Sequence, residues 1–399
     1  MKYAVVTFGC RVNQADSIAI EGGLRAKGAV DALPQHADLV IVNTCSVTAS
    51  ADQGARQTIR RIARENPHAR IVVTGCYATR RPDELRALPN VVRVVSNTEK
   101  DDLVDFLDDI GDGPCGRAVE PGLAGRTALT LRVQTGCEEA CSYCIIPQTR
   151  GAGRSLPLPM VSGRIHEAID AGYKEVVITG VHLGSYGRDL DDGTSLATLV
   201  RHLAQWDGKV LFRLSSLEPM DCTNEIVDLV AGSERLAPHF HLPLQHGADS
   251  VLANMRRPYT TAFFQRLVGR IHAVMPHAAI GSDLIVGFPG ETHDEFVATE
   301  HLLRTLPLSH IHVFPYSDRP GTAASRMNSK VDGLTIRERG SRLRAIGREM
   351  GARFRREQQG TTRRALTVDD GRSAVTDNYV KVQLDRAYPR NEWIDVTID

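Results

Sequence analysis

The sequence lacks three features that would assign it to a broad class at once: a net charge, a long apolar run and a secretory leader. Its 48 basic and 48 acidic residues balance, so overall charge does not indicate a nucleic-acid partner, and any such site must be local. No apolar run approaches the roughly 20 residues of a membrane-spanning helix. The chain start also lacks the basic residues, apolar stretch and cleavage site of a secretory signal. We therefore expect a cytoplasmic protein with no membrane partner.

Cysteines are the residues that most clearly indicate chemistry. The overall composition, 42% hydrophobic and 24% charged over 399 residues, is ordinary for a soluble globular protein of two or three domains. A reducing cytosol disfavours disulfides, so clustered cysteines there more often bind metal or take part in catalysis. The eight cysteines are Cys10, Cys45, Cys76, Cys115, Cys137, Cys141, Cys144 and Cys222.

Residues 1–112 alternate short β-branched runs with polar helical stretches, which predicts an open, mainly parallel α/β sheet. The predicted strands are 3–8, 39–43, 71–74 and 91–95, and the predicted helices are 14–27, 51–65 and 82–87. Three of these strands run into Cys10, Cys45 and Cys76. Because parallel strands place their C-terminal ends on one edge of a sheet, we expect the three cysteines to meet there.

A Gly- and Pro-rich segment at 111–125 reads as a linker, and a second series of strands and helices follows it. Its predicted strands are 129–134, 175–179, 209–214, 239–243, 279–286 and 310–314. Six β/α units predict a partial TIM-type barrel, assigned to residues 123–352, with its functional edge at the C-terminal ends of the strands.

The end of the chain combines a basic helix with a small β module. Residues 335–357 read as a long helix, and between Arg337 and Arg364 ten Arg face three Glu, a net of +7. This charge fits either a solvated, salt-bridged face or contact with phosphates. Residues after Gly360 then show alternating patterns typical of a small antiparallel β module, and the C-terminal domain is assigned to residues 353–399.

The segment from Cys137 to Cys144 has the spacing C-x3-C-x2-C and carries the strongest chemical signal. An iron–sulfur cube ordinarily takes four thiolates, so three from one loop leave one iron open for a ligand. The alternatives are a zinc site or unrelated buried thiols. Zinc ribbons use pairs of C-x2-4-C, and no second pair exists here.

This spacing, with Tyr143 before the last cysteine, resembles the radical S-adenosylmethionine (SAM) signature. The string GCEEACSYCIIPQTRG at 136–151 resembles the methylthiotransferase family more narrowly, as do TFGCRVNQ, VNTCSVT and TGCYA around the first three cysteines. The resemblance extends over the whole chain. It implies a [4Fe–4S] cluster on Cys137, Cys141 and Cys144, a second on Cys10, Cys45 and Cys76, and SAM at the open iron of the first. Cys115 and Cys222 match no family ligand and are expected to be structural thiols.

Within this family, two branches act on tRNA, and the string GCRVNQ at 9–14 looks most like the threonylcarbamoyladenosine branch. The implied reaction is methylthiolation at C2 of N6-threonylcarbamoyladenosine at position 37, beside the anticodon. The alternatives are N6-isopentenyladenosine in tRNA and an aspartate of a ribosomal protein. A tRNA anticodon arm, a low-potential electron donor and a sulfur source are the implied partners. The C-terminal module resembles the RNA-binding TRAM domain, although it is shorter. A non-catalytic iron–sulfur sensor is the alternative from another class.

Candidate SAM contacts lie at the ends of the predicted barrel strands. Gly180 allows close backbone approach, and the remaining candidates supply hydrogen-bonding groups or an adenine-side turn. Each also fits a plain strand-end turn or capped loop. The candidates are Gly180, Ser215, Glu218, Asp283 and Gly287, with His182, Gln245 and His246 as further pocket residues.

Overall fold

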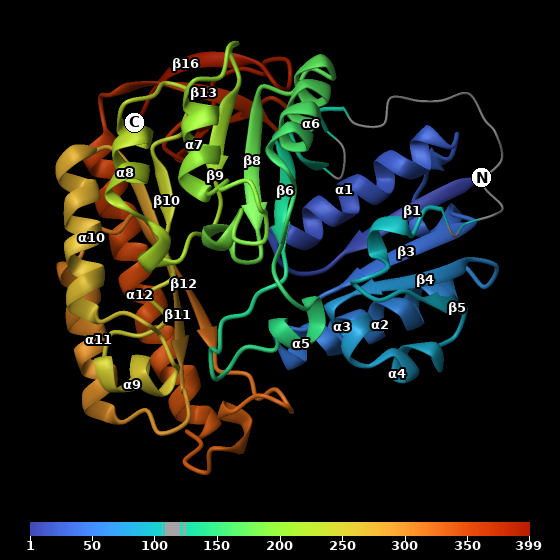
Figure 1. The fold of residues 1–399 in the computed structure, drawn as a ribbon, viewed down its shortest axis with the longest axis horizontal. Coiled ribbons are helices and arrows are strands. Elements are labelled where there is room, and N and C mark those ends of the chain that lie inside the picture. Colours follow the sequence, from blue (N-terminus) through green and yellow to red (C-terminus); the bar gives the residue numbers. More distant parts are fainter. Residues whose placement is uncertain (106, 108–119, 123–124) are drawn as a thin grey trace.

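The computed structural model describes residues 1–105, 107, 120–122 and 125–399, which form three packed parts (Figure 1). An α/β sheet comes first, a half-open barrel second and a small antiparallel sheet last. Cys115 and most of the predicted linker at 111–125 lie outside the described residues.

The N-terminal part is a five-stranded parallel sheet in the order β2-β1-β3-β4-β5. The central strand β3 is buried along its whole length, because apolar cores cover both faces of the sheet. The strands are β1 (Lys2–Thr7), β2 (Val30–Asp31), β3 (Leu39–Thr44), β4 (Arg70–Gly75) and β5 (Val91–Val94). The helices are α1 (Arg11–Ala26), α2 (Ala49–Glu65), α3 (Cys76–Arg80) and α4 (Pro82–Arg86). The predicted open parallel sheet is confirmed.

The central part contains six parallel barrel strands in two sheets, β6-β8-β9 and β10-β11-β12, which isolated bridges join beside β9. Among the described strands, β6 and β12 do not pair, so the barrel stays open between them. The strands are β6 (Leu129–Thr135), β8 (Glu175–Gly180), β9 (Leu211–Leu214), β10 (His239–His241), β11 (Ala279–Val286) and β12 (His310–Pro315), with the short antiparallel β7 (Arg154–Ser155) beside β6. This partial barrel of six β/α units confirms the prediction.

Helices cover the outside of the barrel, and their apolar faces share one large core with the strands. They are α6 (Leu158–Asp170), α7 (Leu196–Ala204), α8 (Asn224–Ala231), α10 (Thr261–Val274), α11 (His293–Thr305) and α12 (Gly333–Gln358). The short α5 (Ile146–Arg150) contacts α3 instead, and α9 (Asp249–Asn254) belongs to a separate small core. The predicted basic helix is α12, and it runs across the boundary predicted between residues 352 and 353.

The C-terminal part is an antiparallel sheet in the order β15-β14-β13-β16, as predicted. Its strands are β13 (Thr362–Val368), β14 (Ser373–Thr376), β15 (Lys381–Gln383) and β16 (Trp393–Thr397). It packs at the N-terminal ends of the barrel strands: Asn378 Nδ2 donates to the His277 carbonyl at 2.9 Å, and Arg390 Nε donates to Thr127 Oγ1 at 3.0 Å.

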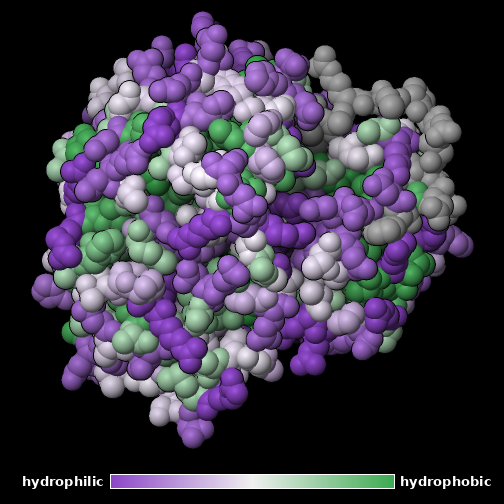
Figure 2. Space-filling view, viewed as in Figure 1, coloured by the Kyte–Doolittle hydropathy of each residue, from purple (hydrophilic) through white to green (hydrophobic). Residues whose placement is uncertain are grey.

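The surface in Figure 2 is mostly hydrophilic, with scattered apolar side chains. None of the helices in the described ranges is long and apolar enough to cross a membrane.

Candidate functional site

The first three cysteines stand at the C-terminal ends of three neighbouring parallel strands. Cys10 caps the start of α1 after β1, Cys45 follows β3, and Cys76 is the first residue of α3 after β4. Because β1, β3 and β4 are adjacent in the sheet, their ends bring the cysteines together, as the sequence predicted.

Gly9 allows this close approach. Its φ is +95°, and a Cβ there would lie 2.5 Å from Cys45 Cβ and 2.6 Å from Cys45 Sγ. Burial, with a smaller contribution from the nearby Cys10 and Cys76, raises the pKa of the Cys45 thiol to about 12 in total. The three sulfurs therefore share one electrostatic environment. Only Cys10 of the three is exposed.

The second cysteine group lies in the loop after β6. Gly136, with φ +75°, starts this loop where a Cβ would lie 1.8 Å from the Ala152 carbonyl oxygen. Ser142 then anchors the loop, because its amide donates to the Met255 carbonyl at 3.0 Å and its hydroxyl donates to the Asn254 carbonyl at 2.8 Å. Burial, together with the two neighbouring cysteines, raises the pKa of the Cys144 thiol to about 12 in total. The loop thus holds three thiols together.

Two cationic groups flank this loop. Arg257 NH1 donates to Cys141 Sγ at 3.0 Å, and the same guanidinium pairs with the Glu218 carboxylate. His182 Nε2 lies 2.8 Å from Asp221 Oδ2. Burial lowers the pKa of His182, but hydrogen bonds with Asp221 and Cys137 outweigh it and raise the pKa to about 9. Both groups therefore carry positive charge at neutral pH beside the thiols.

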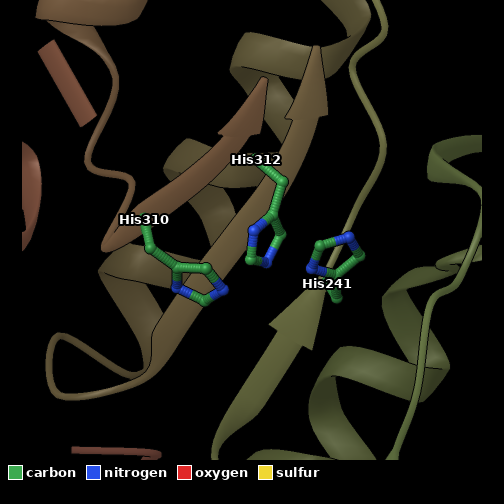
Figure 3. A group of neighbouring side chains, drawn as sticks. All are labelled: His241, His310 and His312. Atoms are coloured by element: carbon green, nitrogen blue, oxygen red, sulfur yellow. The ribbon is translucent and has the colours of Figure 1, made fainter. Parts of the chain in front are cut away.

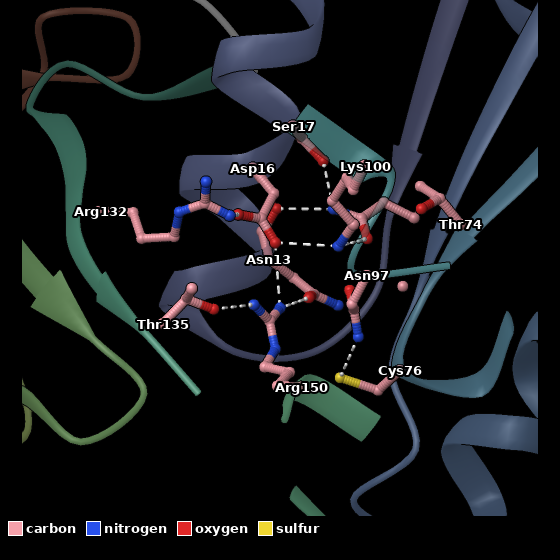
Figure 4. A network of polar contacts seen from close by, with 12 residues as sticks. Asn13, Asp16, Ser17, Thr74, Cys76, Asn97, Lys100, Arg132, Thr135 and Arg150 are labelled. Carbon is pink, nitrogen blue, oxygen red and sulfur yellow. Dashed lines mark hydrogen bonds and ion pairs between the residues drawn. The ribbon is translucent and has the colours of Figure 1, made fainter. Parts of the chain in front are cut away.

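A buried charge network joins the N-terminal sheet to the barrel (Figure 4). At its centre the Asp16 carboxylate, 0% exposed, lies 2.9 Å from Lys100 Nζ, 2.5 Å from Arg132 NH1 and 3.0 Å from Arg150 NH2. Burial alone would raise the pKa of Asp16, but the three cations hold it well below its ordinary value. The Asp16 carboxylate is therefore ionised.

Arg150 lies beside the N-terminal cysteine group and belongs to the segment that follows the second cysteine group in the chain. It ends α5, the helix that directly follows the cysteine loop, and its NH2 donates to Asn13 Oδ1 of α1 at 2.6 Å. Burial would raise the pKa of the Cys76 thiol, but Arg150 and Lys100 lower it below its ordinary value. These cations therefore favour the thiolate, the form of cysteine that binds metal.

A cavity of about 750 Å³ lies inside the half-barrel and reaches the start of α1. Its wall includes Cys10 together with three of the predicted SAM contacts: Gly180 at the end of β8, Ser215 just after β9, and Asp283 on β11. Volumes of this order suit a small-molecule ligand. The roles of these residues stay predictions.

The remaining two predicted contacts do not line this cavity. Glu218 is engaged with Arg257, beside Cys141. Gly287 has φ +76°, and a Cβ there would lie 2.3 Å from Ile336 Cγ1, so the position accepts only glycine without rearrangement. Gln245 and His246 form a turn outside the cavity wall, in which His246 Nδ1 accepts from the Ala248 amide at 3.1 Å.

Three histidines in the cavity were not predicted from the sequence. His241 on β10 and His310 and His312 on β12 place their ligand nitrogens within 4.8 Å of one another (Figure 3). Gly281 makes room for them, because a Cβ there would lie 2.2 Å from His310 Nε2. Burial, and then the neighbouring histidines, lower the pKa of His310 to about 4, so this ring is neutral at pH 7. Burial also lowers the pKa of His312, so His310 and His312 offer neutral ring nitrogens to a ligand or a metal ion.

With this geometry established, comparisons with known proteins place the chain. Residues 2–97 match the family described as uncharacterized protein family UPF0004, and residues 131–303 match the radical SAM superfamily. The threonylcarbamoyladenosine tRNA methylthiotransferase MtaB of Bacillus subtilis is 34% identical over 94% of this chain and 88% of that protein. This chain belongs to the radical SAM methylthiotransferase family.

Two further comparisons bear on this family of transferases. A tRNA-2-methylthio-N(6)-dimethylallyladenosine synthase of Parafrankia sp. is 33% identical, covering 90% of this chain and 76% of the synthase. The radical SAM methyltransferase TsrM of Kitasatospora setae superposes with a TM-score of 0.59 at 16% identity, covering 81% of this chain and 76% of TsrM. The TsrM likeness shows the fold alone. The predicted family resemblance is confirmed.

Membership of this superfamily implies a [4Fe–4S] cluster and SAM as cofactors. The cysteine loop fits such a cluster: its three thiols are free of disulfides, and Arg257 and His182 supply positive charge beside them. Arg150 and Arg257 were missed as site residues, although Arg150 lies in the string at 136–151. Their contacts depend on tertiary packing that no local pattern encodes.

Proposed function

We propose that this methylthiotransferase acts on C2 of N6-threonylcarbamoyladenosine at position 37 of tRNA, giving 2-methylthio-N6-threonylcarbamoyladenosine. The main supporting observation is that Cys10, from the N-terminal cysteine group, lines the same cavity as the barrel strand ends at Gly180 and Ser215. A base bound there would face both parts of the protein. The name of the Bacillus subtilis relative supports tRNA and this modified base.

Two [4Fe–4S] clusters are part of this proposal, one for each cysteine group. We assign the first to Cys10, Cys45 and Cys76 and the second to Cys137, Cys141 and Cys144. Cys137, Cys141 and Cys144 would hold a cluster that supplies one-electron reduction of SAM, and Cys10, Cys45 and Cys76 would hold a cluster that supplies the sulfur. The proposed SAM contacts are Gly180, Ser215, Glu218, Asp283 and Gly287.

The side chains around these groups bind, orient and compensate charge. Arg150 and Lys100 favour the Cys76 thiolate, and Arg257 and His182 place positive charge at the cysteine loop. The reaction replaces C2–H by C2–S–CH₃, so it needs removal of hydrogen, a sulfur atom and a methyl group. An adenine held in the cavity would meet the sulfur before it meets bulk water, which is the advantage of positioning. An electron donor and a sulfur source complete the proposed partners.

The RNA would be held chiefly through its phosphates. Arg344, Arg348 and Arg356 of α12 are exposed and have no ion pair or side-chain hydrogen bond within the described parts of the chain. Other arginines of this helix are engaged: Arg342 pairs with Glu300, and Arg353 donates to the Leu306 carbonyl at 2.9 Å. The three exposed arginines and the TRAM-like module are therefore the proposed contacts for the anticodon arm.

The name of the Parafrankia relative favours a second candidate, methylthiolation of N6-isopentenyladenosine in tRNA. Methylthiolation of a ribosomal-protein aspartate would use the same chemistry. The test offers the reconstituted enzyme both modified tRNAs and the ribosomal protein, with SAM, sulfide and reductant, and identifies products by mass spectrometry. We expect product from the threonylcarbamoyl form. Product only from the isopentenyl form or the ribosomal protein would refute the assignment, and cluster-dependent RNA binding without SAM cleavage would indicate a sensor.

A further inference from the structure

The walls of the cavity carry more positive than negative charge. Among its described lining residues Asp283 is the single carboxylate, against four cationic side chains, namely Arg11, Arg150, Arg355 and Lys381. Two of these cations have carboxylate partners outside the wall: Arg150 pairs with Asp16 at 3.0 Å, and Lys381 pairs with Asp369 at 2.8 Å. The cavity therefore favours a ligand with negative charge.

Arg11 is the cation best placed to receive that charge. It is the first residue of α1, directly after Cys10, and it is half-buried. Its NH2 donates to Tyr379 Oη at 2.9 Å, and its guanidinium carbon lies 5.8 Å from the centre of the Tyr379 ring. No carboxylate of the described residues lies within 4.0 Å of its nitrogens. The planar guanidinium is thus fixed in direction, with donors left for a carboxylate.

Tyr379 is itself held in an unusual backbone conformation to make this contact. Its φ is +70°, a left-handed conformation that non-glycine residues rarely adopt. The preceding residue, Asn378, is fully buried, and its Nδ2 donates to the His277 carbonyl and to Gln358 Oε1, both at 2.9 Å. The fixed turn sets the Tyr379 hydroxyl against Arg11, so the C-terminal module helps to orient a side chain of the cavity.

We propose that Arg11 binds the carboxylate of the threonylcarbamoyl group and so distinguishes this substrate from adenosines with uncharged N6 substituents. The inference rests on the proposed function. In adenine, C2 and C6 both flank N1, so a base whose C2 faces Cys10 presents its N6 substituent close to the next residue, Arg11. The threonylcarbamoyl group ends in a planar carboxylate, which a guanidinium can bind through two hydrogen bonds. An isopentenyl group has neither charge nor acceptor.

The same anionic chemistry has two other sources, the carboxylate of SAM and a phosphate of the RNA. Both are present whichever modified adenosine is offered, so neither would make Arg11 sensitive to the N6 substituent. The decisive experiment therefore changes only the charge of that substituent.

The experiment compares two anticodon stem-loop RNAs, one with the natural threonylcarbamoyl carboxylate and one with the matching carboxamide, on the reconstituted full-length enzyme. A hydrogen bond to a charged group contributes about 1.5–3 kcal/mol, so the wild type should prefer the acid roughly 10- to 100-fold in kcat/KM. Arg11→Gln should bring this ratio close to one, mainly by raising KM for the acid. Arg355→Gln is the matched control, since it removes the same charge from the same wall, and it should keep the wild-type ratio.

Several results would overturn the inference. A wild-type ratio near one would do so without any variant, so the test stands even if Arg11→Gln folds poorly. In Arg11→Gln protein with wild-type iron content, an equal fall in kcat/KM for both RNAs would leave the ratio of acid to carboxamide unchanged. That result would overturn the inference and point to a phosphate instead. Weaker SAM binding without RNA, at an unchanged ratio, would point to the SAM carboxylate. If the wild type modifies neither RNA, the proposed function itself has failed.

Discussion

Replacing Asp16 by Asn tests whether the buried charge network holds the N-terminal sheet against the barrel. The Asp16 side chain is 0% exposed and contacts Lys100 Nζ at 2.9 Å and Arg150 NH2 at 3.0 Å. Asn keeps the shape but removes the charge, which leaves two buried cations without their common carboxylate. Removing one partner of a buried pair costs about 3–5 kcal/mol, so we expect Asp16→Asn to lower the free energy of unfolding by that amount.

The pH dependence of this loss follows from the pKa of Asp16, which the cations hold well below its ordinary value. A carboxyl group with a lowered pKa in the folded state stabilises the protein above its unfolded pKa, about 4. This contribution is lost as the pH falls from there towards the folded-state pKa. The difference in stability between wild type and Asp16→Asn should therefore be complete at pH 7 and shrink below about pH 4.

Urea unfolding followed by circular dichroism measures both effects, and Asp101→Asn is the matched control. Asp101 also pairs with Arg132, at 2.5 Å, but its side chain is 57% exposed. An exposed pair contributes about 0–1 kcal/mol, so the control should lose little. Equal losses for the two variants, or a loss below about 1 kcal/mol for Asp16→Asn, would refute the role given to burial.

The remaining predictions concern the clusters and the RNA. Replacing Cys137, Cys141 and Cys144 together by Ala should lower the iron content of anaerobically reconstituted protein from about eight to about four atoms per chain. A wild-type content near four that this variant retains would contradict two clusters. Cys45→Ala should still cleave SAM under reductant but form no methylthio product, and detection of methylthiolated RNA would show that the N-terminal cysteines are misassigned. Replacing Arg344, Arg348 and Arg356 by Gln should weaken binding of all substrate tRNAs alike and reduce the salt slope by about 0.9 for each phosphate that the variant no longer binds. Arg304→Gln is the control, because Arg304 is exposed but pairs with Glu349 at 2.8 Å, and an unchanged slope in the triple variant would exclude these arginines as phosphate ligands.

The long periodic elements were predictable because each is defined by its own residues. The strand predicted at 39–43 is β3 (Leu39–Thr44), and the basic helix predicted at 335–357 is α12 (Gly333–Gln358). Short elements were missed for the converse reason. β7 (Arg154–Ser155) has two residues, too few for any periodicity, and it exists because β6 offers it a free edge. α3 starts at Cys76 itself, where the sequence showed only the end of a strand.

The cysteine groups were predictable because strand ends and loop spacing are local signals. The residues that surround these groups could not be predicted, because they come from distant parts of the chain. Asp16 contacts Lys100, Arg132 and Arg150, which lie 84, 116 and 134 positions further along the chain. No spacing rule could connect residues so far apart. The histidine group has the same origin: His241 and His312 lie on different strands, and parallel pairing with β11 brings them into one cavity.

The position of Arg150 explains how two cysteine groups on separate sheets can be aligned without a shared strand. Arg150 is the last residue of the short helix α5, which begins directly after the cysteine loop. Its backbone is therefore tied closely to that loop. Its guanidinium is held by Asn13 and Asp16 on α1, the helix that Cys10 caps. A shift of the loop relative to α1 would break a contact with a fully buried carboxylate, which is far more costly than breaking a surface pair. The network therefore fixes the segment after the cysteine loop to the helix that begins at Cys10 through a buried ion pair.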